Sequence, residues 1–131
     1  MKVAIKRLPD AEFEIMRIIW RNTPPMTTLQ IMEKLEQDKN GKNWKPQTVL
    51  TMLVRLIEKG FLASERVGRE RNYMPTITER DYMRVETGNF MTRYQGNSIG
   101  SLVKTLYEGR NLSQEDIQEL KDWLEERRDP K

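Results

Sequence analysis

The stretch that decides the fold is residues 46–60, PQTVLTMLVRLIEKG. Pro46 suits the first position of a helix, where its missing N–H leaves no hydrogen bond unmade, and Gly60 suits the left-handed residue that ends one. Apolar residues between them recur at spacings of three and four and share one face: Val49, Leu53, Leu56 and Ile57. The stretch therefore predicts an amphipathic helix packed against a core.

The other face of this predicted helix is polar. It carries four side chains that are again three and four residues apart: Gln47, Thr48, Thr51 and Arg55. Each suits a DNA groove, because Gln can bond adenine through two hydrogen bonds, Thr can reach a phosphate or a thymine methyl, and Arg can bond guanine or a phosphate. Taken alone, such a stripe is more often an ordinary solvated helix face.

The flanks of this helix favour DNA binding over a merely solvated face. Between Lys39 and Ile57 there are four basic residues and no Asp or Glu; the basic ones are Lys39, Lys42, Lys45 and Arg55. Acidic side chains are thus missing where phosphates would lie. We expect Lys42 and Lys45 to contact the DNA beside the helix.

Two shorter helices are predicted upstream. Pro9 can begin the first, with acidic residues complementing the dipole of its first turn, and residues 22–25 end it. Thr27 and Gln30 form a capping box at the start of the second, which runs to about Gln37.

A hairpin is predicted downstream. Residues 61–66 and 71–74 have the composition of strands, and Gly68 permits the turn between them. Helix, helix, helix, hairpin is the element order of a winged helix-turn-helix domain, which we assign to residues 1–75.

Arginines gather in this predicted wing. Arg66, Arg69 and Arg71 would lie at its tip and edge, within reach of phosphates or of the adjacent minor groove. Glu65 and Glu70 could instead pair with them on the surface. The wing context favours phosphate contact.

Three helices are predicted after Pro75: one to about residue 94, one over residues 99–109, and one capped by Ser113. Their apolar stripes have no sheet to cover them, so we expect residues 76–131 to form a dimerisation region, since two-fold homodimers are the commonest assembly. The residues assigned to it are Tyr82, Phe90, Leu102, Leu106, Ile117, Leu120 and Leu124. The fold class is mainly α with a small β wing.

Charge follows the same division. Residues 1–75 hold 14 Lys or Arg and 9 Asp or Glu, a balance of +5, whereas residues 76–131 hold 9 and 11, a balance of −2. A basic first part suits a polyanion, and a mildly acidic second part suits protein contacts.

The composition argues against catalysis. The chain has no Cys and no His, which removes thiolate nucleophiles, the commonest general base and the commonest metal ligand, and no phosphate-binding Gly-rich loop is present. We expect no enzymatic activity, cofactor or metal. No apolar run is long enough to span a membrane, and we expect a cytoplasmic protein.

Several segments resemble the BlaI/MecI family of penicillinase repressors. They are residues 10–16 (DAEFEIM), Ile19-Trp20, residues 44–49 (WKPQTV) with Thr51, Leu53 and Arg55-Leu56, Lys59-Gly60, Gly68-Arg69 with Tyr73 and Pro75, residues 101–103 (SLV) and residues 112–117 (LSQEDI). These segments are spread from residue 10 to residue 117, so the resemblance extends over nearly the whole chain.

This resemblance implies a homodimer that binds an inverted-repeat operator in double-stranded DNA, silences β-lactamase or related resistance genes, and is inactivated by proteolysis after a membrane sensor-protease detects β-lactam. By position, Thr48, Thr51 and Arg55 match the groove-facing residues of the family. Gln47 stands where the best-known members have Lys, so the resemblance does not by itself imply the same operator sequence. In those members the cut falls between Asn and Phe in the fifth helix, and the aligned bond here is Thr105–Leu106, which departs from that pair of residues.

Three other kinds of winged-helix protein must be distinguished from such a repressor. The related copper-responsive repressors carry a cysteine-rich metal motif, which this chain lacks. A regulator controlled by a small molecule that enters between the DNA-binding and dimer parts stays open as the alternative. An adaptor that does not bind DNA is disfavoured by the acid-free basic flank.

Overall fold

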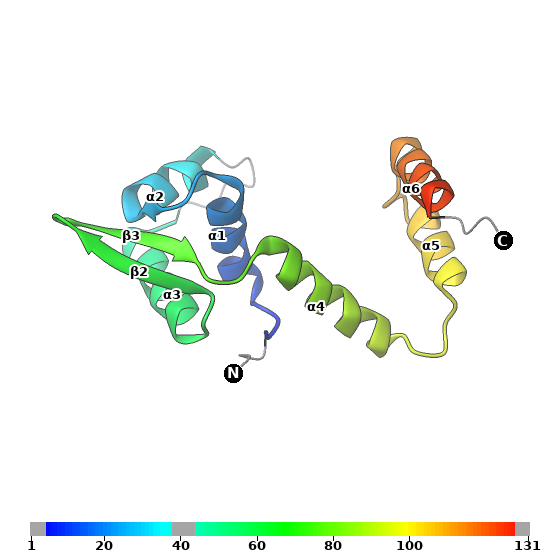
Figure 1. The fold of residues 1–131 in the computed structure, drawn as a ribbon, viewed down its shortest axis with the longest axis horizontal. Helices are drawn as coiled ribbons and strands as arrows, with labels where there is room; N and C mark the ends of the chain where they lie inside the picture. The colour runs from blue at the N-terminus through cyan, green and yellow to red at the C-terminus, as the bar shows by residue number, and fades with distance from the viewer. Residues whose placement is uncertain (1–4, 38–43, 128–131) are drawn as a thin grey trace. The chain divides into compact units, whose positions relative to one another are not determined.

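The computed structural model describes residues 5–37 and 44–127, and the chain divides into two compact units, Met1–Phe90 and Met91–Lys131. The elements, shown in Figure 1, are α1 (Asp10–Arg21), β1 (Met26–Thr27), α2 (Thr28–Gln37), α3 (Pro46–Glu58), β2 (Leu62–Val67), β3 (Glu70–Pro75), α4 (Glu79–Arg93), α5 (Ile99–Glu108) and α6 (Gln114–Glu126). The prediction of a mainly helical chain with a small β wing is confirmed. None of the helices in the described ranges is long and apolar enough to cross a membrane.

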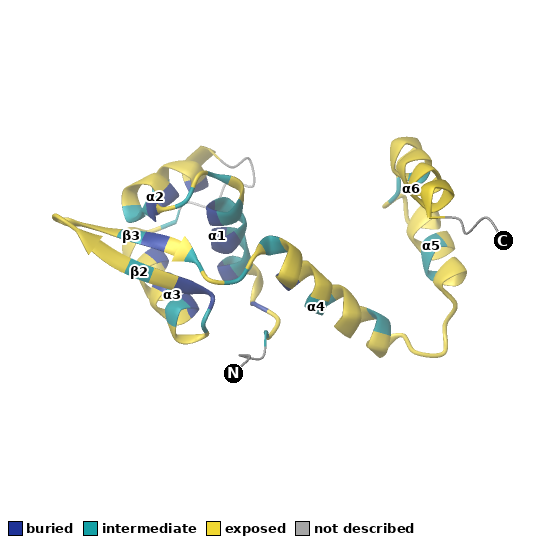
Figure 2. Cartoon of the chain, viewed as in Figure 1, coloured by how far each residue is buried: buried dark blue, intermediate teal, exposed yellow. Residues whose placement is uncertain are grey.

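The core of the first unit lies where α1, α2 and α3 meet the sheet, as the dark blue segments in Figure 2 show. Ile15 on α1, Ile31 on α2 and Leu53 on α3 are each 0% exposed. Phe61 and Tyr73 complete this core from the side of the hairpin. Burial of one such side chain contributes about 1.5–3 kcal/mol, so the cluster fixes α3 firmly to the unit.

The sheet has a third strand that local sequence patterns do not predict. Its order is β1-β3-β2, and β1 pairs antiparallel with β3 through Met26↔Tyr73 and Thr27↔Asn72. A strand of two residues is too short to show alternation, so only its distant partner reveals it. The predicted capping box at this point is confirmed: the Thr27 N–H donates to Gln30 Oε1 at 2.9 Å, and the Gln30 N–H donates to Thr27 Oγ1 at 3.2 Å.

Both predicted ends of α3 are confirmed. Pro46 occupies the first turn, and Gly60 has a φ of +84°. The Gly60 N–H donates to the Ile57 carbonyl at 3.0 Å, and the Phe61 N–H donates to the Leu56 carbonyl at 2.9 Å. This pair of bonds is the Schellman motif, which satisfies carbonyls that the last helical turn leaves open.

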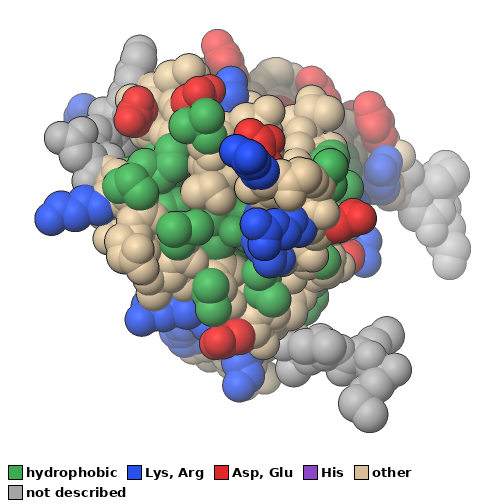
Figure 3. Space-filling view, turned by 90° about the vertical axis from the view of Figure 1, so that its left-hand side faces the viewer, with side chains coloured by type: hydrophobic (Ala, Val, Ile, Leu, Met, Phe, Trp, Pro, Cys, Tyr) green, Lys and Arg blue, Asp and Glu red, His purple; other side chains and the backbone are tan. Residues whose placement is uncertain are grey.

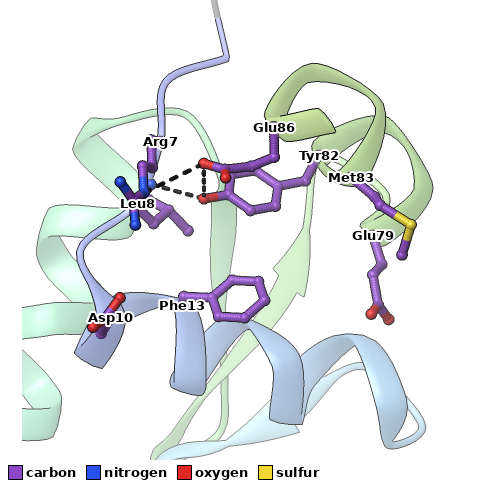
Figure 4. A pocket seen from close by; sticks show the side chains of 8 residues that line it. All are labelled: Arg7, Leu8, Asp10, Phe13, Glu79, Tyr82, Met83 and Glu86. Carbon is purple, nitrogen blue, oxygen red and sulfur yellow. Dashed lines mark hydrogen bonds and ion pairs between the residues drawn. The ribbon is translucent and has the colours of Figure 1, made fainter. Parts of the chain in front are cut away.

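The first turns of α4 belong to the core of the first unit. Tyr82 is 5% exposed, and its ring stacks on Phe13 with the centroids 5.6 Å apart. Its hydroxyl accepts the Leu8 N–H at 2.8 Å and donates to Glu86 Oε1 at 3.2 Å (Figure 4). The first compact unit accordingly includes α4 as far as Phe90.

The second unit consists of two capped helices with little buried surface. The Ser98 side chain accepts the Ser101 N–H at α5, and Ser113 and Asp116 form a reciprocal capping box at α6, as predicted for Ser113. The bond from the Ser113 N–H lowers the pKa of Asp116 below its ordinary value. No described residue of α5 or α6 is buried.

Candidate nucleic-acid interface

The buried face of α3 fixes which side chains this helix presents to solvent. Val49, Leu53 and Leu56 are each 0% exposed. The residues predicted to read DNA all fall in the exposed class: Gln47, Thr48, Thr51 and Arg55. The two faces are therefore separated as the spacing predicted. Lys45 is exposed at the N-cap of α3, whereas Lys42 lies outside the described residues.

An ion pair ties the end of α3 to α1. Lys59 Nζ lies 2.6 Å from Glu12 Oε1, and Glu12 is 4% exposed. A carboxylate at this depth requires a charged or hydrogen-bonding partner. The sequence indicated only that Glu12 complements the dipole of α1, because no local spacing connects it to Lys59.

The hydroxyl of Thr51 is directed into its own helix. Thr51 Oγ1 donates to the Gln47 carbonyl at 2.9 Å. A hydroxyl has one hydrogen, so in this arrangement Thr51 has none to donate to DNA. It keeps acceptor lone pairs and its methyl group.

Two apolar side chains on the exposed side of α3 were not recognised from the sequence. Leu50 is 38% exposed and Val54 is 53% exposed. They lie three and seven residues after Gln47, so they share its face. Their helical spacing from Gln47 was the sequence signal that could have placed them on this face.

The register of the wing separates its arginines from its acids. Arg66 and Arg71 are directly opposite across β2 and β3, on the sheet face that also carries the buried Tyr73. Glu65 pairs with Asn72 and therefore points to the other face, as does Glu70. The surface ion pairs considered as an alternative are absent: within the part of the chain described, none of the ion pairs involves Arg66, Arg69 or Arg71.

Two like charges opposite each other destabilise a hairpin unless an anion lies between them. Arg71 is held in place by Ser64, to whose Oγ its Nη1 donates at 2.9 Å. Arg69 follows Gly68 in the turn, where a φ of +64° suits glycine. The wing thus presents three exposed guanidinium groups, of which that of Arg71 is held by a hydrogen bond, and a phosphate would stabilise them.

Figure 3 looks onto the end of the first unit from which the wing projects. Basic side chains stand out from a surface with many hydrophobic side chains, and acidic side chains lie mostly toward its margin. Positive charge and apolar area therefore occur together on this face, and this suits DNA, whose phosphates attract positive charge and whose major groove offers the apolar thymine methyl.

The residues assigned to dimerisation fall into two groups. Leu102 and Ile117 are half-buried, whereas the others on α4 to α6 are exposed: Phe90, Leu106, Leu120 and Leu124. Tyr82 is buried in the first unit, where it packs on Phe13, so we remove it from the dimerisation set.

The aligned cleavage bond, Thr105–Leu106, lies inside α5. Thr105 Oγ1 donates to the Ser101 carbonyl at 2.9 Å. Proteases preferentially cut exposed loops, so this bond requires local opening of the helix.

Metal chemistry finds no support in the described ranges. They hold no group of three or more His, Cys, Asp or Glu residues that could bind an ion.

Comparison with known proteins agrees with this architecture. The sequence profile of the penicillinase repressor family matches residues 8–126. The penicillinase repressor of Bacillus licheniformis is 36% identical over 127 residues, which are 97% of this chain and 96% of that protein. The methicillin resistance regulatory protein MecI of Staphylococcus aureus is 30% identical over 117 residues, covering 89% and 92% of the two chains.

A solved structure gives the same result for the first unit. The DNA binding domain of the repressor BlaI superposes with a TM-score of 0.51 at 37% identity, covering 62% of this chain and 94% of that one. This structural likeness extends over most of the BlaI domain, and the family profile matches nearly the whole of this chain. The chain belongs to the penicillinase repressor family of winged-helix transcriptional repressors, which are not enzymes.

Proposed function

We propose that this chain is a homodimeric repressor that binds an inverted-repeat operator and silences β-lactamase or related antibiotic-resistance genes. The observation that carries the proposal is the occurrence, in one rigidly packed unit, of an exposed polar face on α3 and an opposed arginine pair on the wing. The names of the relatives, penicillinase repressor and methicillin resistance regulatory protein, support the choice of genes.

In this proposal α3 lies in the major groove and the wing contacts the backbone beside it. The N-terminal turns of a recognition helix read base edges, and these turns carry Gln47, Thr48 and Thr51. Arg55 follows one turn later. Lys45, at the N-cap, is placed for a phosphate.

Selection from a random pool of duplex DNA tests the proposal. The full chain should enrich an inverted repeat whose half-sites lie about one helical turn apart, because each protomer presents one α3. Enrichment of no sequence would contradict a function as a sequence-specific repressor.

The wing arginines should control the salt dependence of binding. Arg66→Ala combined with Arg71→Ala should weaken binding to all sequences and lower the slope of log affinity against log salt by about 0.9 for each phosphate that the variant no longer neutralises. Fluorescence anisotropy over a range of salt concentrations measures this slope. An unchanged slope would exclude the wing pair from the phosphate interface.

The dimer is proposed to form through α5 and α6. Leu120 and Leu124 are 40% and 52% exposed on one face of α6, and Ile117 lies beside them. Two-fold pairing would bury both copies of this stripe, and burial of each apolar side chain contributes about 1.5–3 kcal/mol.

Leu120→Asp is therefore expected to produce monomers at concentrations where the wild type sediments as a dimer. Gln118→Glu is the matched control, because it adds one negative charge on the opposite side of α6, where Gln118 now donates to Asp122. Unchanged dimers of the Leu120→Asp variant would remove this stripe from the interface.

Release from DNA is proposed to follow cleavage by a membrane sensor-protease after β-lactam detection. A cut between Thr105 and Leu106 would detach α6 and the end of α5, and with them much of the apolar stripe. A neighbouring gene for a membrane metalloprotease with a penicillin-binding domain would support this route.

A second candidate is control by a small molecule, which a cavity of about 260 Å³ beside the start of α4 favours. Phe13, Tyr82 and Met83 give it an apolar lining, with Glu86 and Arg7 among its polar groups (Figure 4). Met83→Trp would fill the cavity. A ligand-controlled repressor with this change should bind DNA but no longer respond to inducer, whereas a protease-controlled one should still respond.

A further inference from the structure

The exposed side of α3 has an apolar row beside its polar row. Gln47, Thr51 and Arg55 follow one another at intervals of four residues, and Leu50 and Val54 form a neighbouring row with the same interval. Val54 is 53% exposed and Leu50 is 38% exposed. The middle of the exposed side is therefore partly hydrocarbon.

Neither of these apolar side chains belongs to the core or to the partly buried hydrophobic residues packed against it. The inner face of α3 already contacts the core through residues that are 0% exposed, such as Val49 and Leu53. A valine on an exposed helix surface is also a weaker helix former than alanine or leucine. Single exposed apolar residues are ordinary, but Leu50 and Val54 adjoin the side chains that would read bases.

Thr51 extends this apolar area. Its hydroxyl hydrogen is used by the bond to the Gln47 carbonyl, 2.9 Å long. The methyl group of Thr51 lies on the same side of the helix as Leu50 and Val54, which are one position before it and three after it in the sequence. Together the three residues form a patch, which we call the Leu50–Val54 patch.

The base edge that suits such a patch is thymine, because its methyl is the distinguishing apolar group of the major groove. We infer that the Leu50–Val54 patch selects thymine at one or more operator positions by contact with the 5-methyl group. Gln47, beside the patch, suits adenine. This inference rests on the proposed DNA binding and adds the base that the apolar residues recognise.

Replacing thymine by deoxyuridine, one position at a time, in the selected operator tests the inference. The change removes one methyl and keeps the base pair. At the contacted position the wild type should lose about fourfold in affinity for each half-site, the equivalent of one buried methylene. Changing both half-sites together should cost the dimer on the order of 15-fold.

Val54→Ser is the informative variant, because it removes both methyl groups of the side chain from the patch, places a hydroxyl there, and has a helix propensity similar to that of valine. It should bind the thymine and deoxyuridine operators with nearly equal affinity. Val67→Ser is the matched control, since Val67 is 59% exposed on β2, outside α3. This control should keep the thymine preference.

Two outcomes overturn the inference and can be told apart. Equal wild-type affinity for thymine and deoxyuridine at every position would remove the methyl contact and leave the repressor function standing. Failure of the full chain to bind any duplex DNA would remove the proposed function and this inference with it. A thymine preference that persists in Val54→Ser would also overturn the assignment to Val54.

Discussion

Tyr82→Ala is expected to lower the free energy of unfolding by about 3–5 kcal/mol, the usual cost of deleting a buried aromatic ring. The Tyr82 ring is within 5.7 Å, between centroids, of three other rings: Phe13, Trp20 and Phe61. Its removal leaves a cavity among them. The Leu8 N–H, which donates to the Tyr82 hydroxyl at 2.8 Å, also loses its acceptor.

Chemical denaturation followed by tryptophan fluorescence measures this loss. In a Trp123→Phe background the signal comes from Trp20 and Trp44, both in the first unit. Met83→Ala is the control, because Met83 neighbours Tyr82 and is 57% exposed. This control should change stability by no more than about 0.5 kcal/mol. Equal stability of the two variants would show that Tyr82 does not anchor α4.

The hydroxyl of Tyr82 can be tested separately from its ring. Tyr82→Phe keeps the packing and leaves the Leu8 N–H without its acceptor, at a cost of about 1–3 kcal/mol. Burial raises the pKa of Tyr82 above its ordinary value, so the folded state favours the neutral phenol. The resulting stability is complete below a pH of about 10 and is lost as pH rises through the folded pKa. Tyr82→Phe should reduce this alkaline loss.

The elements of the first unit could be predicted because their signals are local. The Thr27–Gln30 capping box involves residues three apart, and the Gly60 cap acts within the last turn of α3. The two faces of α3 follow from helical spacing alone. Such interactions depend on sequence neighbours, which stay neighbours in the fold.

Interactions between distant residues could not be predicted. Tyr82 bonds to a backbone group 74 residues away, and Glu12 bonds to a lysine 47 residues away. Helical spacing places Tyr82 on an apolar stripe but does not tell whether that stripe meets its own domain or a second chain. For this reason the sequence alone assigns Tyr82 to the dimer and does not reveal β1.

The apolar residues of α3 show a third limit. Leu50 and Val54 adjoin the buried stripe in sequence, so hydrophobicity suggests the core, whereas the packing leaves them 38% and 53% exposed. Which edge of an amphipathic helix is covered depends on where its neighbours end. The sequence therefore predicted the polar residues of the candidate site on α3, but it did not predict that Leu50 and Val54 lie beside them.

Arg55→Ala is expected to weaken specific operator binding by about 1–3 kcal/mol in each half-site. A two-fold dimer carries the change twice, so the complete operator should lose about 2–6 kcal/mol. Arg55 lies on the exposed side of α3, one turn after Thr51, and a guanidinium there can form two parallel hydrogen bonds to guanine. Arg55→Lys keeps the charge without this planar fork, so it should recover only the phosphate part of the affinity.

Titration of the selected operator and of a scrambled duplex with each variant separates these contributions. Loss of base contact lowers affinity for the operator and leaves the scrambled duplex nearly unchanged, whereas loss of a phosphate contact lowers both. Arg80→Ala is the control, because Arg80 is an exposed arginine of the same unit that belongs to α4 and to neither α3 nor the wing. If Arg55→Ala and Arg80→Ala bind the operator equally well, α3 does not read DNA through Arg55, since both changes remove one positive charge and only Arg55 belongs to the groove-facing row.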